Sequence, residues 1–186
     1  MLFLPGLAAV AGIFVAMSQG AIAAQFGVAD SNMKMGIAKL DGGKVTGYVG
    51  TDRSVKDGEE PVVLLGVGGG TAEKLCLSTL LDVPIAGAVS LNVSAGEKTP
   101  VDIDGLTANA TELLTPDGVL SDAQLGRDGS TLDQNQLVKG PRGSWGLQAG
   151  ALQARDVRMT AFNAGAASLR LSGLSIKVTP GRHECF

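Results

Sequence analysis

The sequence offers few side chains that could form a catalytic site. Residues 142–146 read Arg-Gly-Ser-Trp-Gly, which differs from the Gly-x-Ser-x-Gly elbow of serine hydrolases because Arg142 replaces the first glycine. The chain has one histidine, His183, and a catalytic triad needs a histidine base that a third group holds in place. A single histidine close to the end of the sequence is more typical of a surface residue than of a catalytic base. We therefore expect no enzyme activity.

Two further motifs could hold a phosphate or a metal ion, but both lack essential parts. Residues 66–70 read Gly-Val-Gly-Gly-Gly after an apolar run, yet Thr71 stands where a dinucleotide-binding loop has its third glycine. Asp102 and Asp104 precede a glycine, as in part of a calcium loop, but the glycine comes too early and no glutamate follows at the required distance. We therefore expect a flexible strand-to-turn connection, a plain Asp-Gly turn, and no cofactor or metal.

The charged residues exclude another function class. The chain of 186 residues has a net charge of -3, and its lysines and arginines are scattered without interleaved aromatic residues. A nucleic-acid-binding surface needs a basic stripe or patch, so we expect no nucleic-acid partner.

Two cysteines, Cys76 and Cys185, leave two interpretations open. A disulfide between them would tie the end of the chain to the body of the domain, and disulfides persist in oxidising compartments. Two buried free thiols are the alternative. We favour the disulfide because the start of the sequence indicates export.

That start is a long apolar segment without charge, and the first charged residue is Asp30. Its length suffices to cross a bilayer as a helix. One interpretation is a signal peptide, since Ala21-Ile22-Ala23 fits the small-x-small cleavage pattern. The other is a retained membrane helix. We expect residues 1–24 to form a transmembrane or signal-anchor helix and residues 25–186 an extracytoplasmic β domain.

Small residues recur at every fourth position of this segment and would form one ridge on a helix. Such ridges let helices approach closely inside a membrane. The ridge predicts helix packing with other copies or with a partner through Ala8, Gly12, Ala16, Gly20 and Ala24.

The rest of the chain consists of short alternating runs typical of strands. Apolar and polar or small residues alternate over 33–38, 89–94 and 106–111. Residues 41–43, Asp-Gly-Gly, predict a hairpin turn, and the polar segment 125–145 predicts a long irregular loop. Residues 71–81 fit a helix or a strand. We expect a mainly β fold, an antiparallel sandwich or barrel-like domain, with a β-solenoid as the alternative.

Several short motifs, taken in order, resemble an uncharacterised family of actinobacterial envelope proteins, a domain of unknown function. They lie at residues 19–26, 75–78, 82–84, 156–161, 171–174 and 184–186. The resemblance implies an exported protein in which both cysteines belong to the family pattern. It also implies a partner, because the family is often encoded beside a small multi-span membrane protein. Some relatives are labelled cholesterol esterase, but this chain lacks a nucleophile elbow and a triad base.

These observations predict a non-catalytic structural or assembly protein of the cell envelope, either bound to the membrane or secreted. Its N-terminal helix would pack in a homo-oligomer or filament, with a multi-span membrane partner, or against membrane lipid. The alternative is an extracytoplasmic protein that binds a lipid or another apolar ligand, because an aliphatic core with 27 glycines could leave a cavity.

Overall fold

The computed structural model describes residues 24–27, 32–54, 58–84 and 87–186, and strands dominate these ranges. Their bounds are β1 (Ala24–Gly27), β2 (Met33–Ser54), β3 (Gly58–Glu73), β4 (Leu75–Val83), β5 (Gly87–Ala95), β6 (Val101–Leu114), β7 (Asp117–Ser121), β8 (Gln124–Asp128), β9 (Trp145–Ala166), β10 (Ser168–Arg170) and β11 (Ser175–Pro180). A single 3-10 turn, η1 (Gly129–Thr131), accompanies them. The prediction of a mainly β fold is confirmed.

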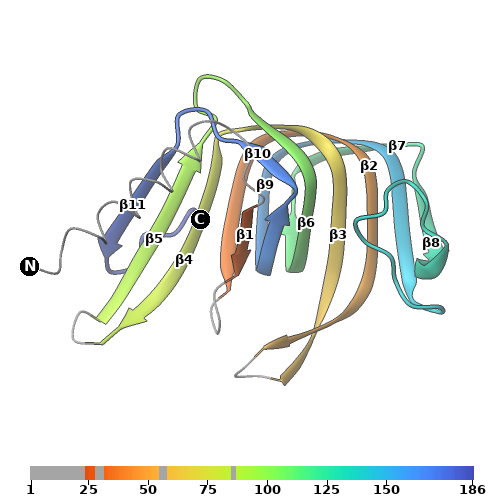
Figure 1. Cartoon of the computed structure of the whole chain (residues 1–186), viewed down its shortest axis with the longest axis horizontal. Helices are drawn as coiled ribbons and strands as arrows, with labels where there is room; N and C mark the ends of the chain where they lie inside the picture. The colour runs from red at the N-terminus through yellow and green to blue at the C-terminus, as the bar shows by residue number, and fades with distance from the viewer. Residues whose placement is uncertain (1–23, 28–31, 55–57, 85–86) are drawn as a thin grey trace, which may run out of the picture.

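The described strands form one antiparallel sheet with the order β1-β9-β6-β3-β2-β4-β5-β11. It curls, because β2 pairs with β3, β3 with β6, β6 with β9, and β9 again with β2. Figure 1 shows β2 and β3 arching over one end, with β4, β5 and β11 forming a wing at the other. A β-solenoid stacks parallel strands, whereas each of these pairings is antiparallel.

Glycines allow the bend in β2 and β3. The predicted turn at residues 41–43 was wrong, because Gly42 and Gly43 lie inside β2 and pair with Gly70 and Gly69. A Cβ atom on Gly70 would lie 2.1 Å from the main-chain oxygen of Asp41. Only glycine permits this approach. Residues 66–70 therefore lie within a paired strand that approaches β2 closely, and they are not a strand-to-turn connection.

Residues 71–81 contain no helix. They form the end of β3 and most of β4, which are joined at Lys74, whose φ of 51° lies in the left-handed region. Together β3 and β4 follow β2 along its whole length, and pairing with the neighbouring strand therefore decides the structure of this ambiguous segment.

The core lies on the inner face of the curled sheet. Met33, Met35 and Ile37 are buried, whereas the alternate residues Lys34 and Gly36 face outward and are partly exposed. They pack in one cluster with side chains from β3, β4, β5, β6 and β9. This confirms the strand predicted from the alternation over residues 33–38.

The predicted N-terminal helix lies outside the described residues apart from its last position. Ala24 begins β1 and pairs with Ala166 of β9, so this member of the predicted ridge belongs to a strand. In the described ranges, no helix has the length and hydropathy needed to cross a membrane.

Candidate functional site: an apolar cavity

The inner face of the curled sheet encloses a cavity of about 280 Å³. Apart from Thr115 and Gly118, its lining consists of aliphatic and methionine side chains. These are Met35, Ile37, Leu40 and Val45 of β2; Leu65 and Val67 of β3; Leu106, Ala108 and Leu113 of β6; Leu120 of β7; and Leu147, Leu152, Val157 and Met159 of β9. The cavity offers an apolar ligand a surface with almost no hydrogen-bonding groups.

The mouth of the cavity lies beside the link between β6 and β7. Leu113 and Leu120 line the cavity, yet they are 47% and 40% exposed, so they form part of its rim. Thr115 of this link and Gly118 of β7 also line the cavity. Exposed leucines around an apolar opening are a feature of ligand entrances and interaction surfaces.

A long loop, residues 132–144, supports the cavity wall from the opposite face. Thr46 follows the cavity-lining Val45 in β2 and is fully buried beneath this loop, where its hydroxyl donates to Asn135 Oδ1 at 2.9 Å. Asn135 Nδ2 donates to the main-chain oxygens of Lys44 and Gly66. This one amide side chain therefore joins the loop to both β2 and β3.

Gln148 makes a second connection between loop and wall. It follows the cavity-lining Leu147 in β9 and is 1% exposed. Its amide accepts from the backbone N–H of Asp133 at 2.9 Å and donates to the carboxylate of Asp133 at 2.8 Å. Buried amides need such partners, so the loop and the wall are ordered together.

Asp128 holds the start of the same loop. Its carboxylate accepts from the hydroxyl and the backbone N–H of Ser130, at 2.7 and 2.9 Å, and from the backbone N–H of Gly143 at 2.8 Å. These hydrogen bonds lower the pKa of Asp128 below its ordinary value. The Ser130 hydroxyl has the largest effect, and the two backbone N–H groups add to it. The bonds cap η1 and close the base of the loop.

An open groove of about 690 Å³ lies on the outer face, behind part of the cavity. Its floor contains one row of residues that cross four paired strands: Cys76 of β4, Gly36 of β2, Arg158 of β9 and Leu114 of β6. Lys74 and Asp156 add charges to its walls. The groove therefore carries charged side chains, which the lining of the cavity lacks.

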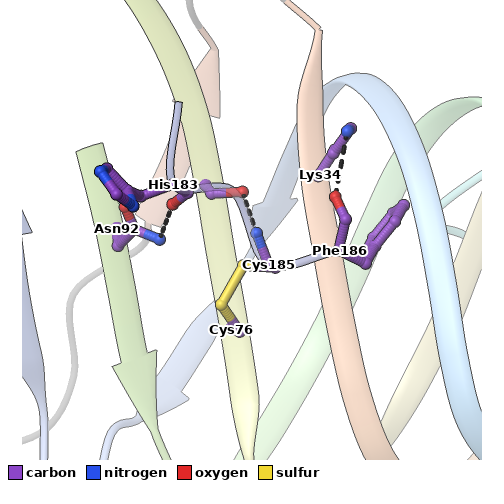
Figure 2. Close-up of a disulfide and its surroundings, with 7 residues drawn as sticks. Lys34, Cys76, Asn92, His183, Cys185 and Phe186 are labelled. Carbon is purple, nitrogen blue, oxygen red and sulfur yellow. Dashed lines mark hydrogen bonds between the residues drawn. A yellow bond between two sulfur atoms is a disulfide. The ribbon is translucent and has the colours of Figure 1, made fainter. Parts of the chain in front are cut away.

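The disulfide between Cys76 and Cys185 lines one side of this groove. Figure 2 shows how it ties the end of the chain to the neighbouring strand. The predicted pairing is confirmed, with a Cα–Cα separation of 5.9 Å. The backbone N–H of Cys185 donates to Ser78 Oγ at 2.9 Å, and Asn92 Nδ2 donates to the main-chain oxygen of His183 at 2.7 Å. Residues 181–186 are thus bound across β4 and β5.

The docked tail ends with Phe186 beside two cations. Lys34 Nζ donates to the main-chain oxygen of Phe186 at 3.1 Å and forms an ion pair with Glu184 at 3.3 Å. The charged groups of Lys34 and Arg158 lie 5.3 and 5.8 Å from the centre of the Phe186 ring. Both distances suit cation–π attraction.

The structure does not bring the potential catalytic residues together. Ser144 donates to the main-chain oxygen of Pro141 and packs near Gly129, just after β8. The backbone N–H of His183 instead donates to Ser90 of β5. Strands β5 and β8 lie at opposite ends of the molecule in Figure 1, so these two side chains form no catalytic pair.

The expected Asp-Gly turn after Asp104 was wrong, because this segment lies within β6. Asp102 pairs with Arg170 across the strands at 3.8 Å, and Gly105 has a φ of +63°. Its backbone oxygen accepts from the N–H of Ala167, so this glycine serves the link between β9 and β10.

Of the predicted packing residues, Ala24 lies in β1, and Ala8, Gly12, Ala16 and Gly20 lie outside the described residues. The sequence indicated that a glycine-rich aliphatic core could leave a cavity, but it did not indicate which residues line that cavity. What defines a cavity is the space left between residues of five strands, and no local pattern encodes that space.

Comparison with known proteins gives one family match. Residues 29–186 match the model of a family described as a family of unknown function (DUF6230). No curated protein and no solved structure matches the chain. The family match includes both cysteines and each described strand except β1. The chain therefore belongs to this family of unknown function.

Proposed function

We propose that this protein binds an apolar ligand, such as the acyl chain of a lipid, in the cavity between β2, β3, β6 and β9. The single observation that carries the proposal is an interior space of about 280 Å³ with an almost wholly aliphatic lining and an opening beside Leu113 and Leu120. Its size is close to the lower end of ligand sites, roughly 300 Å³.

A cavity of this size is costly when nothing fills it. Protein interiors are close-packed, and an enclosed void destabilises a protein by roughly 24 cal/mol per Å³. Even if the open mouth removes half of that cost, the remainder is on the order of 3 kcal/mol, a large part of the stability of a typical domain. Aliphatic cavities stay dry and accept apolar molecules, so a bound chain would recover this energy.

The disulfide and the family resemblance support a place outside the cytoplasm. Disulfides persist in oxidising compartments, and the short motifs resemble those of actinobacterial envelope proteins. We therefore propose an exported protein, either attached to the membrane or secreted, in which a lipid is an accessible ligand.

Assembly through the N-terminal segment is a second proposal, supported by the spacing of small residues at positions 8, 12, 16 and 20. Replacing Gly12 and Gly20 by leucine would break such packing. Light scattering should then show a smaller assembly, and an unchanged size would refute the proposal. Ligand binding does not depend on this result.

Titration of the full chain with decanol tests the ligand proposal. Burial of about nine carbon groups, at roughly 0.8 kcal/mol each, gives a Kd on the order of 10 µM. Displacement of the neutral dye Nile red measures this binding. Mass spectrometry of gently extracted protein should also show a bound lipid.

Two variants locate the binding. Ala108→Phe fills the cavity, and Leu113→Glu places a charge at its mouth, so each should weaken decanol binding at least about tenfold. Ala151→Phe and Val119→Glu are matched controls, because these residues belong to β9 and β7 but do not line the cavity. The proposal would be refuted if the variants and the controls lost decanol affinity equally, or if the unaltered chain bound no decanol.

A further inference from the structure

The cavity and the outer groove lie on opposite faces of the sheet and share part of their wall. Ile37, Val157 and Thr115 line both of them. Ile37 and Val157 are paired residues of β2 and β9, and Thr115 follows the end of β6. At this place only the thickness of the sheet therefore separates a ligand in the cavity from the groove.

The sheet is interrupted at this junction. Along one edge of β9, Arg158 pairs with Leu114 of β6 and Arg155 pairs with Asp117 of β7. The residues between them, Asp156 and Val157, have no pairing partner on these two strands. The interruption coincides with a left-handed conformation at Asp156, with a φ of 49°.

The link between β6 and β7, which consists of Thr115 and Pro116, lies at the interruption. The Thr115 hydroxyl donates to the main-chain oxygen of Arg155 at 2.7 Å, which fixes the position of the link. Leu113 faces the cavity and Leu114 faces the groove, so the end of β6 borders both spaces. A chain that leaves the cavity past Thr115 would enter the groove.

Two positively charged side chains line the groove. Arg158 and Lys74 line it and are exposed, and within the described part of the chain neither forms an ion pair. Arg158 instead contacts the face of the Phe186 ring, which orients its guanidinium group and leaves its N–H donors free. Among the described residues that line the groove, Asp156 is the one acidic side chain.

We propose that the ligand is an anionic amphiphile, with its chain in the cavity and its acid group on Arg158 in the groove. Lys74 supplies the second positive charge. The planar guanidinium group of arginine suits a carboxylate or a phosphate, since it donates two parallel hydrogen bonds to either. This inference rests on the proposed function and adds the chemical class of the ligand.

Three probes with the same ten-carbon chain separate the head group from the chain. Decanol is neutral, decanoate carries a carboxylate, and decyl phosphate carries a phosphate. At neutral pH and low salt, the full chain should bind the preferred anion about tenfold more tightly than decanol, which is the strength of one charge-assisted contact. The ratio between the two anions distinguishes a fatty acid from a phospholipid as the source of the head group.

Substitution of Arg158 tests the site. Arg158→Gln should remove the advantage of the anions and leave decanol binding unchanged, whereas Lys74→Gln should reduce that advantage in part. Arg155→Gln is the matched control, because Arg155 lies three residues away in β9 and outside the groove.

The outcomes separate the inference from the function on which it rests. If the unaltered chain binds decanol and both anions equally, or if Arg158→Gln weakens decanol as much as the anions, the anionic class is wrong and the apolar site stands. If none of the probes binds, both are wrong. Loss of the anion advantage in Arg158→Gln alone supports the inference.

Discussion

The guanidinium carbon of Arg158 lies 5.8 Å from the centre of the Phe186 ring. These residues come from the middle of β9 and from the docked tail, and the Cys76–Cys185 disulfide adjoins Phe186 in the chain. The disulfide therefore does more than hold the tail on the sheet. It places an aromatic ring against the arginine to which we assign the acid group of a ligand.

Removal of the disulfide should destabilise the protein. The bond closes a loop across 109 residues of sequence, and loss of a native disulfide typically costs about 2–5 kcal/mol. Urea unfolding of Cys76→Ser and Cys185→Ser should show similar losses, and the double variant should lose little more. Hydrogen exchange over residues 181–186 should accelerate in each variant. Unchanged exchange there would show that the hydrogen bonds alone hold the tail.

Gly70 should not tolerate a side chain, whereas Gly43 should. A Cβ atom on Gly70 would lie 2.1 Å from a backbone oxygen, but one on Gly43 would lie no closer than 3.8 Å to its neighbours. Gly70→Ala should lower the free energy of unfolding by more than about 3 kcal/mol and Gly43→Ala by about 1 kcal/mol or less. Equal stability of the two variants in urea would contradict the close approach of the β2 and β3 backbones at Gly70.

Gln148→Leu should loosen the loop behind the cavity wall. The change removes the amide partner of the Asp133 backbone N–H, at a cost of about 1–3 kcal/mol. Hydrogen exchange should accelerate over residues 132–144 and stay unchanged in β4 and β5. Gln153→Leu is the matched control, since Gln153 is an exposed glutamine of the same strand. An equal response to both changes would argue against this role of Gln148.

Asp128 should make the stability depend on pH in the acid range. Its pKa is lowered in the folded protein by the Ser130 hydroxyl and by backbone N–H groups, so the carboxylate stabilises the fold above its unfolded pKa. This contribution declines as the pH falls through the folded pKa. The stability difference between the unaltered chain and Asp128→Asn should therefore be constant near neutral pH and shrink in acid. Ser130→Ala should reduce the difference, and a difference independent of pH would count against the assignment.

Alternation predicted much of the fold. The buried positions of residues 33–37 face the core as their period of two requires, and most of residues 125–145 form the expected irregular loop. The sequence failed where long-range pairing overrides local preference. Asp41-Gly42-Gly43 has the chemistry of a turn, but β3 and β9 pair with both edges of this segment and keep it extended.

The candidate site was harder to predict than the strands. The disulfide could be predicted because the chain has two cysteines and its start indicates export. The junction of cavity and groove depends on an interruption at Asp156 and on which residues of β6 and β7 pair beside it. These are properties of register, and neither the spacing of leucines nor the scattered charges determines register.

The most direct test of the central claim is a map of the contacts of a bound chain. Isotope-edited nuclear Overhauser measurements with carbon-13-labelled decanoate would record which methyl groups lie near its methylene groups. The cavity proposal predicts contacts with the methyl groups of Leu65, Val67 and Met159, all of which line the cavity. Contacts confined to outward-facing or edge residues such as Val119 and Val178 would contradict it.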